Sequence, residues 1–94
     1  MAELLGEVKE TVPILFNSSE GFIYICEKGL DIKTKDSRIQ SPFNYVESIR
    51  ESKELPLAKF QVEMVVYNML GEKFRLNFII SDTHLGILKK ACGK

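Results

Sequence analysis

The residues whose types could support catalysis are one histidine and a group of glutamates. His84 is the single histidine of the chain, and its side chain suits a general base or a metal ligand. Glu47 and Glu51 are four residues apart, with Glu54 three further on, so on a helix the first two would form a carboxylate pair for acid–base work or for a hard cation. Because no nucleophile or second ligand stands near His84 in the sequence, we interpret His84 as an exposed helical residue and the glutamates as solvated charge.

The two cysteines offer a second chemistry. Cys26 and Cys92 lie far apart, with no CxxC pair, whereas a zinc site normally needs four ligands at characteristic spacing. A disulfide between them remains an open alternative to two thiols. The chain also lacks GxSxG, Walker-type, GxGxxG and HExxH motifs, so we expect no enzyme, no metal and no cofactor.

Lys33 and Lys35 fall on one face of an expected strand, with Arg38 close by. This group could form a small anion or nucleic-acid patch, or it could be charged cover that discourages edge pairing. Thirteen basic residues balance thirteen acidic ones, whereas a dedicated nucleic-acid binder usually carries a basic excess. Nucleic acid is therefore the less favoured partner, and a small nucleic-acid- or anion-associated barrel is our alternative function.

The sequence gives no sign of export or membrane insertion. The first residues, MAELLGEVKET, lack the basic and apolar regions of a signal peptide, and no window approaches 18 apolar residues. We therefore expect a cytoplasmic chain with no membrane partner.

The elements that must position these residues are clearest in the last third of the chain. Apolar and polar residues alternate along 59–69 and 72–81, which predicts two strands joined by a turn at Gly71. From Asp82 the spacing becomes helical, with Ser81 or Asp82 as the N-cap and Gly93 as the stop. Leu85, Leu88 and Cys92 form the expected buried face.

Earlier segments predict further short strands. We expect strands within 4–16, 21–27 and 30–35, a turn cluster at 17–21, and an edge or a bulge at Pro13. Residues 43–45 suit a turn or a one-turn helix, and 53–57 a loop. Periodicity does not decide between strand and helix for 46–52.

Together these elements predict a single α+β domain spanning 1–94. Six or seven short antiparallel strands would curl into a sheet or small barrel, with one C-terminal helix covering an open side.

Three segments carry a resemblance to pleckstrin-homology-like domains of the PH/GRAM type. They are GFIYICEKGLDIKTK, IQSPFNYVESI and the long hairpin followed by a helix. The chain also resembles small uncharacterised archaeal proteins, some of them PH-like. The resemblance implies a barrel used as an interaction module. Phosphoinositide binding is not carried over, because the matching loop, 17–21, has no Lys or Arg and carries Glu20.

Large apolar residues on the outer face of the hairpin predict where a partner would bind. Val65, Tyr67 and Ile79 break the expected polar face, and such a patch usually marks an interface, although a barrel with two partly buried faces would also explain it. We therefore expect a non-enzymatic, adaptor-type protein-interaction module whose partner is another protein or a second copy of this chain.

Overall fold

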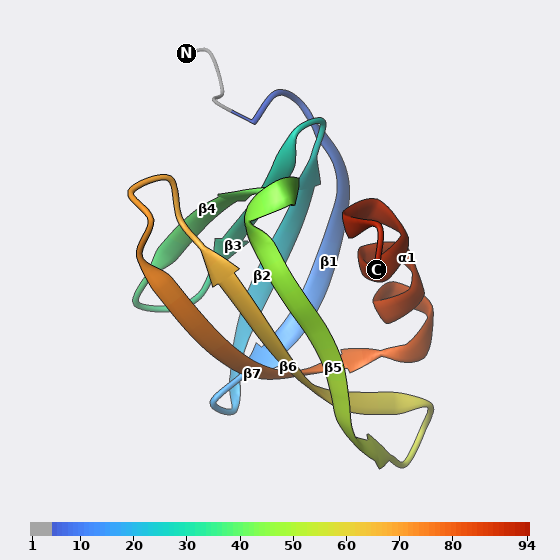
Figure 1. Cartoon of the computed structure of the whole chain (residues 1–94). Coiled ribbons are helices and arrows are strands. Elements are labelled where there is room, and N and C mark those ends of the chain that lie inside the picture. The colour runs from blue at the N-terminus through green and yellow to red at the C-terminus, as the bar shows by residue number, and fades with distance from the viewer. Residues whose placement is uncertain (1–4) are drawn as a thin grey trace.

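The computed structural model describes residues 5–94 as a curled antiparallel sheet with one helix (Figure 1). In chain order the elements are β1 (Val8–Phe16), β2 (Ser19–Cys26), β3 (Gly29–Lys33), β4 (Arg38–Pro42), the 3₁₀ helix η1 (Phe43–Tyr45), β5 (Val46–Leu55), β6 (Lys59–Tyr67), β7 (Lys73–Ser81) and α1 (Asp82–Cys92). The predicted α+β class, with a curled antiparallel sheet and a C-terminal helix, is confirmed.

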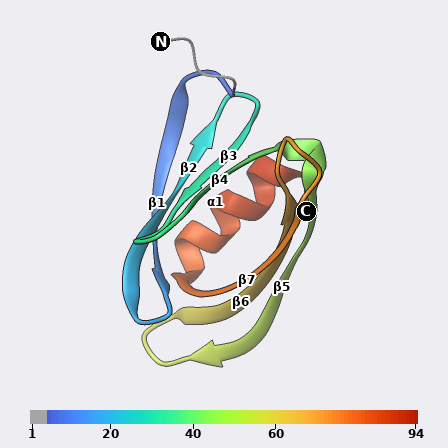
Figure 2. The ribbon, with the colours of Figure 1, turned by 90° about the vertical axis from the view of Figure 1, so that its left-hand side faces the viewer.

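Within the described residues the seven strands follow the order β4-β3-β2-β1-β7-β6-β5. Strand β1 pairs with β2 along its whole length but is in register with β7 only at Leu15 and Ile79. The sheet therefore turns sharply between β1 and β7, and its two halves face each other. Helix α1 contacts β1, β7 and η1, and Figure 2 shows it across the opening between the halves.

The core lies between the two halves and beneath the helix. Val12, Ile23 and Ile32 point inward from the first half, and Val62, Met64 and Ile80 from the second. Leu85 and Leu88 are buried from the helix side. Each fully buried aliphatic side chain contributes roughly 1.5–3 kcal/mol through the hydrophobic effect, so the helix is held mainly by this packing.

The predicted C-terminal hairpin is confirmed. Phe60 pairs with Ile80 and Val66 with Phe74, and both phenylalanines pack against the core. Gly71 has a φ of 83°, the left-handed conformation expected of it. The helix begins as predicted, because the Ser81 side chain accepts a hydrogen bond from the His84 amide, and Gly93 ends it in left-handed geometry.

Other boundaries differ from the sequence predictions. Residues 46–52 are strand, and this strand continues to Leu55, so the predicted loop at 53–57 was wrong for 53–55, and only 56 and 57 lie in the turn. Leu57 and Ala58 both adopt positive φ, which lets a short turn close the hairpin directly. The turn predicted at 17–21 is shorter in the structure for the same reason. Asn17 and Ser18 take left-handed conformations, and β2 already begins at Ser19.

Pro13 is neither bulged nor on an outermost strand. It is in register with Phe22, and the bulge in β1 lies between Val8 and Glu10. Because β1 meets β7 in register only at Leu15, the side of β1 facing β7 is a locally open edge near Pro13, where a missing amide donor is tolerated.

Two glycines give opposite predictions for stability. A Cβ added at Gly86, inside α1, meets nothing within 4 Å, whereas one at Gly29 would clash with the backbone of Ser41 and Pro42. We expect Gly86→Ala to raise the free energy of unfolding by about 0.5–1 kcal/mol, because alanine has the higher helix propensity. Gly29→Ala should lower it. Urea denaturation of both variants checks the pair, and a destabilised Gly86→Ala would show that the helix needs flexibility there.

Candidate ligand-binding pocket

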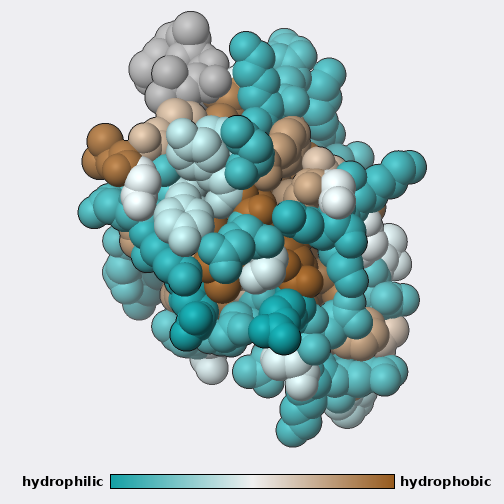
Figure 3. Space-filling view, viewed as in Figure 1, coloured by the Kyte–Doolittle hydropathy of each residue, from teal (hydrophilic) through white to brown (hydrophobic). Residues whose placement is uncertain are grey.

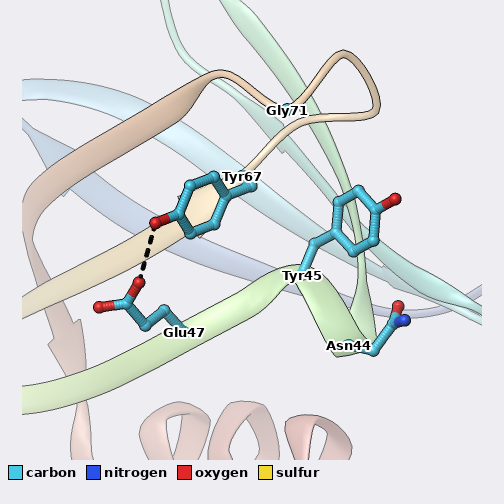
Figure 4. A pocket seen from close by; sticks show the side chains of 5 residues that line it. All are labelled: Asn44, Tyr45, Glu47, Tyr67 and Gly71. Atoms are coloured by element: carbon cyan, nitrogen blue, oxygen red, sulfur yellow. Dashed lines mark hydrogen bonds between the residues drawn. The ribbon is translucent and has the colours of Figure 1, made fainter.

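A pocket of about 420 Å³ lies where η1, the start of β5 and the β6–β7 loop meet. Its lining residues are Asn44, Tyr45, Glu47, Tyr67 and Gly71, all labelled in Figure 4. Ligand pockets commonly measure roughly 300–1,000 Å³. The volume is therefore sufficient for a small ligand or for a side chain of a partner.

Glu47 is placed in this pocket by a bulge. The register of β5 against β6 pairs Val46 with Val66 but Ser48 with Val65, so Glu47 is an extra residue without a direct partner. A bulge of this kind redirects a side chain. Here the Tyr67 hydroxyl donates a hydrogen bond of 3.1 Å to Glu47 Oε1.

The hydrogen bond to Glu47 is the main reason that the pKa of Tyr67 is raised above its ordinary value, and desolvation and the charge of Glu47 act in the same direction. Tyr67 thus remains a hydrogen-bond donor at neutral pH, which fixes the carboxylate beside its ring.

Tyr45 forms the opposite wall of the pocket. It lies on η1, which follows Pro42 and is anchored by a hydrogen bond from the Phe43 amide to the Lys28 carbonyl oxygen. The Tyr45 side chain is 39% exposed. Figure 4 shows its ring beneath the β6–β7 loop, whereas the Tyr67 ring points away from the loop, toward Glu47.

The β6–β7 loop is fixed by the Asn68 side chain. Asn68 Oδ1 accepts hydrogen bonds from the amides of Leu70 and Glu72, both at 2.9 Å, and Nδ2 donates to Glu72 Oε1. This loop nevertheless presents apolar residues to solvent, since Leu70 is 86% exposed and Met69 is also exposed. In Figure 3 a hydrophobic projection stands on the side where this loop lies in Figure 1.

The predicted basic group is only partly assembled. Strand β3 ends at Lys33, and Lys35 lies in the following turn, so the predicted common strand face for Lys33 and Lys35 was wrong. Thr34 and Ser37 close this turn through their side chains. Lys33 is paired in register with Arg38 across β3 and β4.

The charge of Arg38 is neutralised by Asp31, which is only 8% exposed. Arg38 Nε lies 3.0 Å from Asp31 Oδ1 and Nη2 lies 2.6 Å from Oδ2, a two-pronged ion pair. Paired in this way, the guanidinium offers less attraction to an external anion.

The predicted interface residues do not gather in one patch. Val65 lies on the outer face between Glu63 and Tyr67 but is only 5% exposed. Ile79 is in register with Gln61, six residues from Tyr67 along β6, or about 20 Å at strand rise. Tyr67 belongs to the pocket described above, whereas Ile79 lies beside Leu15 of β1.

His84 and Glu51 each interact with a side chain that belongs to the fold. His84 Nδ1 lies 2.8 Å from Ser81 Oγ, and both line a shallow groove of about 240 Å³ with Lys59 and Glu20. Glu51 accepts a 2.6 Å bond from Lys89 Nζ, which ties β5 to α1. Because 46–55 is a strand, Glu47 and Glu51 are separated by about 13 Å and do not form the helical carboxylate pair considered above.

Both cysteines are present as thiols in the structure. Cys26 is buried, with Sγ 3.7 Å from the Tyr24 carbonyl oxygen, and Cys92 is half-buried on α1. Burial raises the pKa of the Cys92 thiol to about 11, and the charge of Lys94 acts in the opposite direction.

Residues 5–94 contain no group of three or more His, Cys, Asp or Glu side chains placed to hold a metal ion. No helix in this range has the length and apolar character needed to cross a membrane.

Comparisons with known proteins address the fold. No family model matches the chain, and no curated protein matches it. Six chains of solved structures do match. One is the crystal structure of the C-terminal domain of an unknown protein from Leishmania infantum, with a TM-score of 0.62 and 12% identity over 93% of this chain and 84% of that one. At this identity the similarity shows the fold alone.

Sequence reasoning missed most of the pocket. It named Tyr67 and Glu47 for different roles, and it did not select Tyr45 or Asn44. The available signal was the NMLGE turn, in which two large apolar residues occupy the tip of a hairpin.

The Tyr67–Glu47 hydrogen bond predicts a pH effect. Glu47→Ala removes the acceptor and its charge, so the pKa of Tyr67 should fall toward its ordinary value. In the native protein the stabilisation from this bond is present below the unfolded tyrosine pKa and is lost as pH rises through the folded one. A ¹³C NMR titration of the tyrosine ring carbons measures the change. Glu54→Ala is the matched control, and an unchanged Tyr67 titration in Glu47→Ala would contradict the assigned cause.

Cys92 should react slowly with alkylating reagents. A rise in its pKa from 9.0 to about 11 lowers the thiolate fraction at neutral pH roughly 100-fold. Iodoacetamide labelling followed by peptide mass spectrometry should show slow modification of Cys92 in buffer and rapid modification in urea. Equal rates under the two conditions would show that the helix end opens freely.

Proposed function

We propose that this chain is a non-enzymatic protein-interaction module that contacts its partner through the β6–β7 loop. The observation that carries the proposal is the combination of order and exposure at this loop. The Asn68 side chain fixes it, and Leu70 still stands 86% exposed at its tip. A loop whose backbone is already held in one conformation loses little backbone entropy when a partner covers it, which favours binding.

The arrangement of ionisable groups supports a role without catalysis. His84 is hydrogen-bonded to the N-cap serine of its own helix, Glu51 is paired with Lys89, and Glu47 accepts from Tyr67. Each group has a partner that serves the fold or the pocket, and no two of them converge on a common reacting position. We place the module in the cytoplasm as part of the same proposal.

The strand order and the closing helix support a further part of the proposal, that the architecture is pleckstrin-homology-like. Self-association through Val65, Tyr67 and Ile79 is less favoured than binding at the loop. Val65 is nearly inaccessible and Ile79 lies far from the other two, so a second copy would find no continuous apolar patch there.

The two exposed leucines allow a matched test of the loop. Leu70 and Leu57 are 86% and 87% exposed on different hairpin turns, so replacing either with serine should change the free energy of unfolding by less than about 0.5 kcal/mol. We expect Leu70→Ser to weaken capture of native partners about tenfold, as loss of one buried leucine contact would. Leu57→Ser should have no effect.

The measurement is quantitative mass spectrometry of proteins retained from native lysate by the immobilised wild type and the two variants. Retention of the same proteins by all three would contradict binding through the loop. Greater loss with Leu57→Ser would place the contact at the opposite hairpin turn.

A further inference from the structure

We propose that the pocket between Tyr45 and Tyr67 binds a cationic side chain of the partner polypeptide, either a methylated ammonium or a guanidinium group. The inference rests on the proposed interaction function and specifies its chemistry.

The two tyrosine rings provide aromatic walls for a cation. Among residues 5–94 the ring pair in stacking contact is Phe22 with Tyr24, so Tyr45 and Tyr67 are not packed on each other and leave the space that the pocket occupies. In Figure 4 the Tyr67 ring extends from β6 toward Glu47 and the Tyr45 ring extends from η1 on the other side of this space. A cation over an aromatic face within about 6 Å is attracted by the ring quadrupole, and two faces bind it better than one.

The charge at the pocket also favours a cation. Glu47 Oε1 accepts the Tyr67 hydroxyl, and Oε2 has no partner within the described residues, so it can face a ligand. Among the residues that line the pocket, Glu47 carries the charge, and Lys73 is in register with Tyr67 on the neighbouring strand. The negative charge in the lining opposes an anionic ligand.

The hydrogen bond between Tyr67 and Glu47 strengthens both recognition elements. Donation to a carboxylate makes the phenol ring more electron-rich, which increases its attraction for a cation, and it also holds the carboxylate in place. The bulge at Glu47 and the loop fixed by Asn68 form this arrangement without a ligand. Little reorganisation is therefore needed on binding.

The neighbouring loop favours a polypeptide over a free small molecule as the source of the cation. Gly71 lines the pocket, while Met69 and Leu70 line a groove of about 250 Å³ on the same loop. Arg38, whose charge is paired with Asp31, and Ile39 lie on the other side of this groove. A Cβ at Gly71 would meet nothing within 4 Å, so the rim between the pocket and the groove is open. A chain carrying the cationic side chain can therefore lay apolar neighbours on Met69 and Leu70.

The first experiment tests charge recognition with a matched pair of probes. Choline and 3,3-dimethylbutan-1-ol differ only in a trimethylammonium against a tert-butyl group. In ¹H–¹⁵N NMR titrations we expect choline to shift the amides of Tyr45, Glu47, Tyr67 and Gly71, with at least about tenfold weaker binding of the neutral isostere. No shift at roughly 50 mM choline, or equal binding of the isostere, would overturn the inference.

Variants test the walls and the carboxylate separately. Tyr45→Leu and Glu47→Gln should each weaken choline binding by about five- to tenfold, whereas Tyr45→Phe, which keeps the aromatic face, should retain it. Glu54→Gln, on the same strand, is the control. Lys73→Ser should strengthen binding by removing the nearby positive charge. Unchanged binding in both Tyr45→Leu and Glu47→Gln would overturn the site.

A peptide arm tests the source of the cation. A short peptide with trimethyllysine or arginine between leucines should bind more tightly than choline, and Leu70→Ser should weaken the peptide but leave choline unchanged. Choline binding as tightly as both peptides would overturn the polypeptide source. If cations fail to bind while partner capture still depends on Leu70, the inference fails and the proposed function stands. If choline binds while partner capture does not depend on Leu70, the cation site stands and the proposed function fails.

Discussion

The fold depends on a short connection that joins the two outermost strands of the sheet. Strands β4 and β5 lie at opposite ends of the strand order, yet β4 ends at Pro42 and β5 begins at Val46. Four residue steps span at most about 14 Å. The sheet must therefore curl until its first and last strands meet at η1, and the sharp turn between β1 and β7 follows from this requirement. The helix then covers an open end that the curl itself cannot fill.

Charged residues contribute to this closure as well as to solubility. Lys89 on α1 reaches Glu51 on β5, and Asp31 with Arg38 joins β3 to β4. An exposed ion pair such as Lys89 with Glu51 contributes roughly 0–1 kcal/mol, so its main effect is to select geometry. The same logic applies to Glu47 and Tyr67, where one hydrogen bond fixes a carboxylate at the meeting point of η1, β5 and β6.

Features set by neighbouring residues in the sequence could be predicted, whereas features that depend on contacts between distant residues could not. The alternation around Phe60 and Phe74, the cap at Ser81 and the stop at Gly93 are local signals, and the structure confirms them. Residues 53–55 were misassigned because left-handed conformations at Leu57 and Ala58 are not evident from residue type. The burial of Asp31 is not a local signal, since it depends on a guanidinium from the next strand. The pocket joins Tyr45 and Tyr67, 22 positions apart, through the register of β5 with β6, in which Val46 pairs with Val66. Periodicity left 46–52 open between strand and helix, so this register could not be predicted.

The location of the pocket at this junction links occupancy to global stability. Its walls come from η1 and from β6, so a bound molecule spans the point where the sheet closes. The unfolded chain has no such site, and an occupant at 100 times its dissociation constant would stabilise the native state by about 2.7 kcal/mol through mass action. Binding of a partner would then stabilise the closed sheet. The bound module would resist thermal unfolding and proteolysis more strongly than the unbound one.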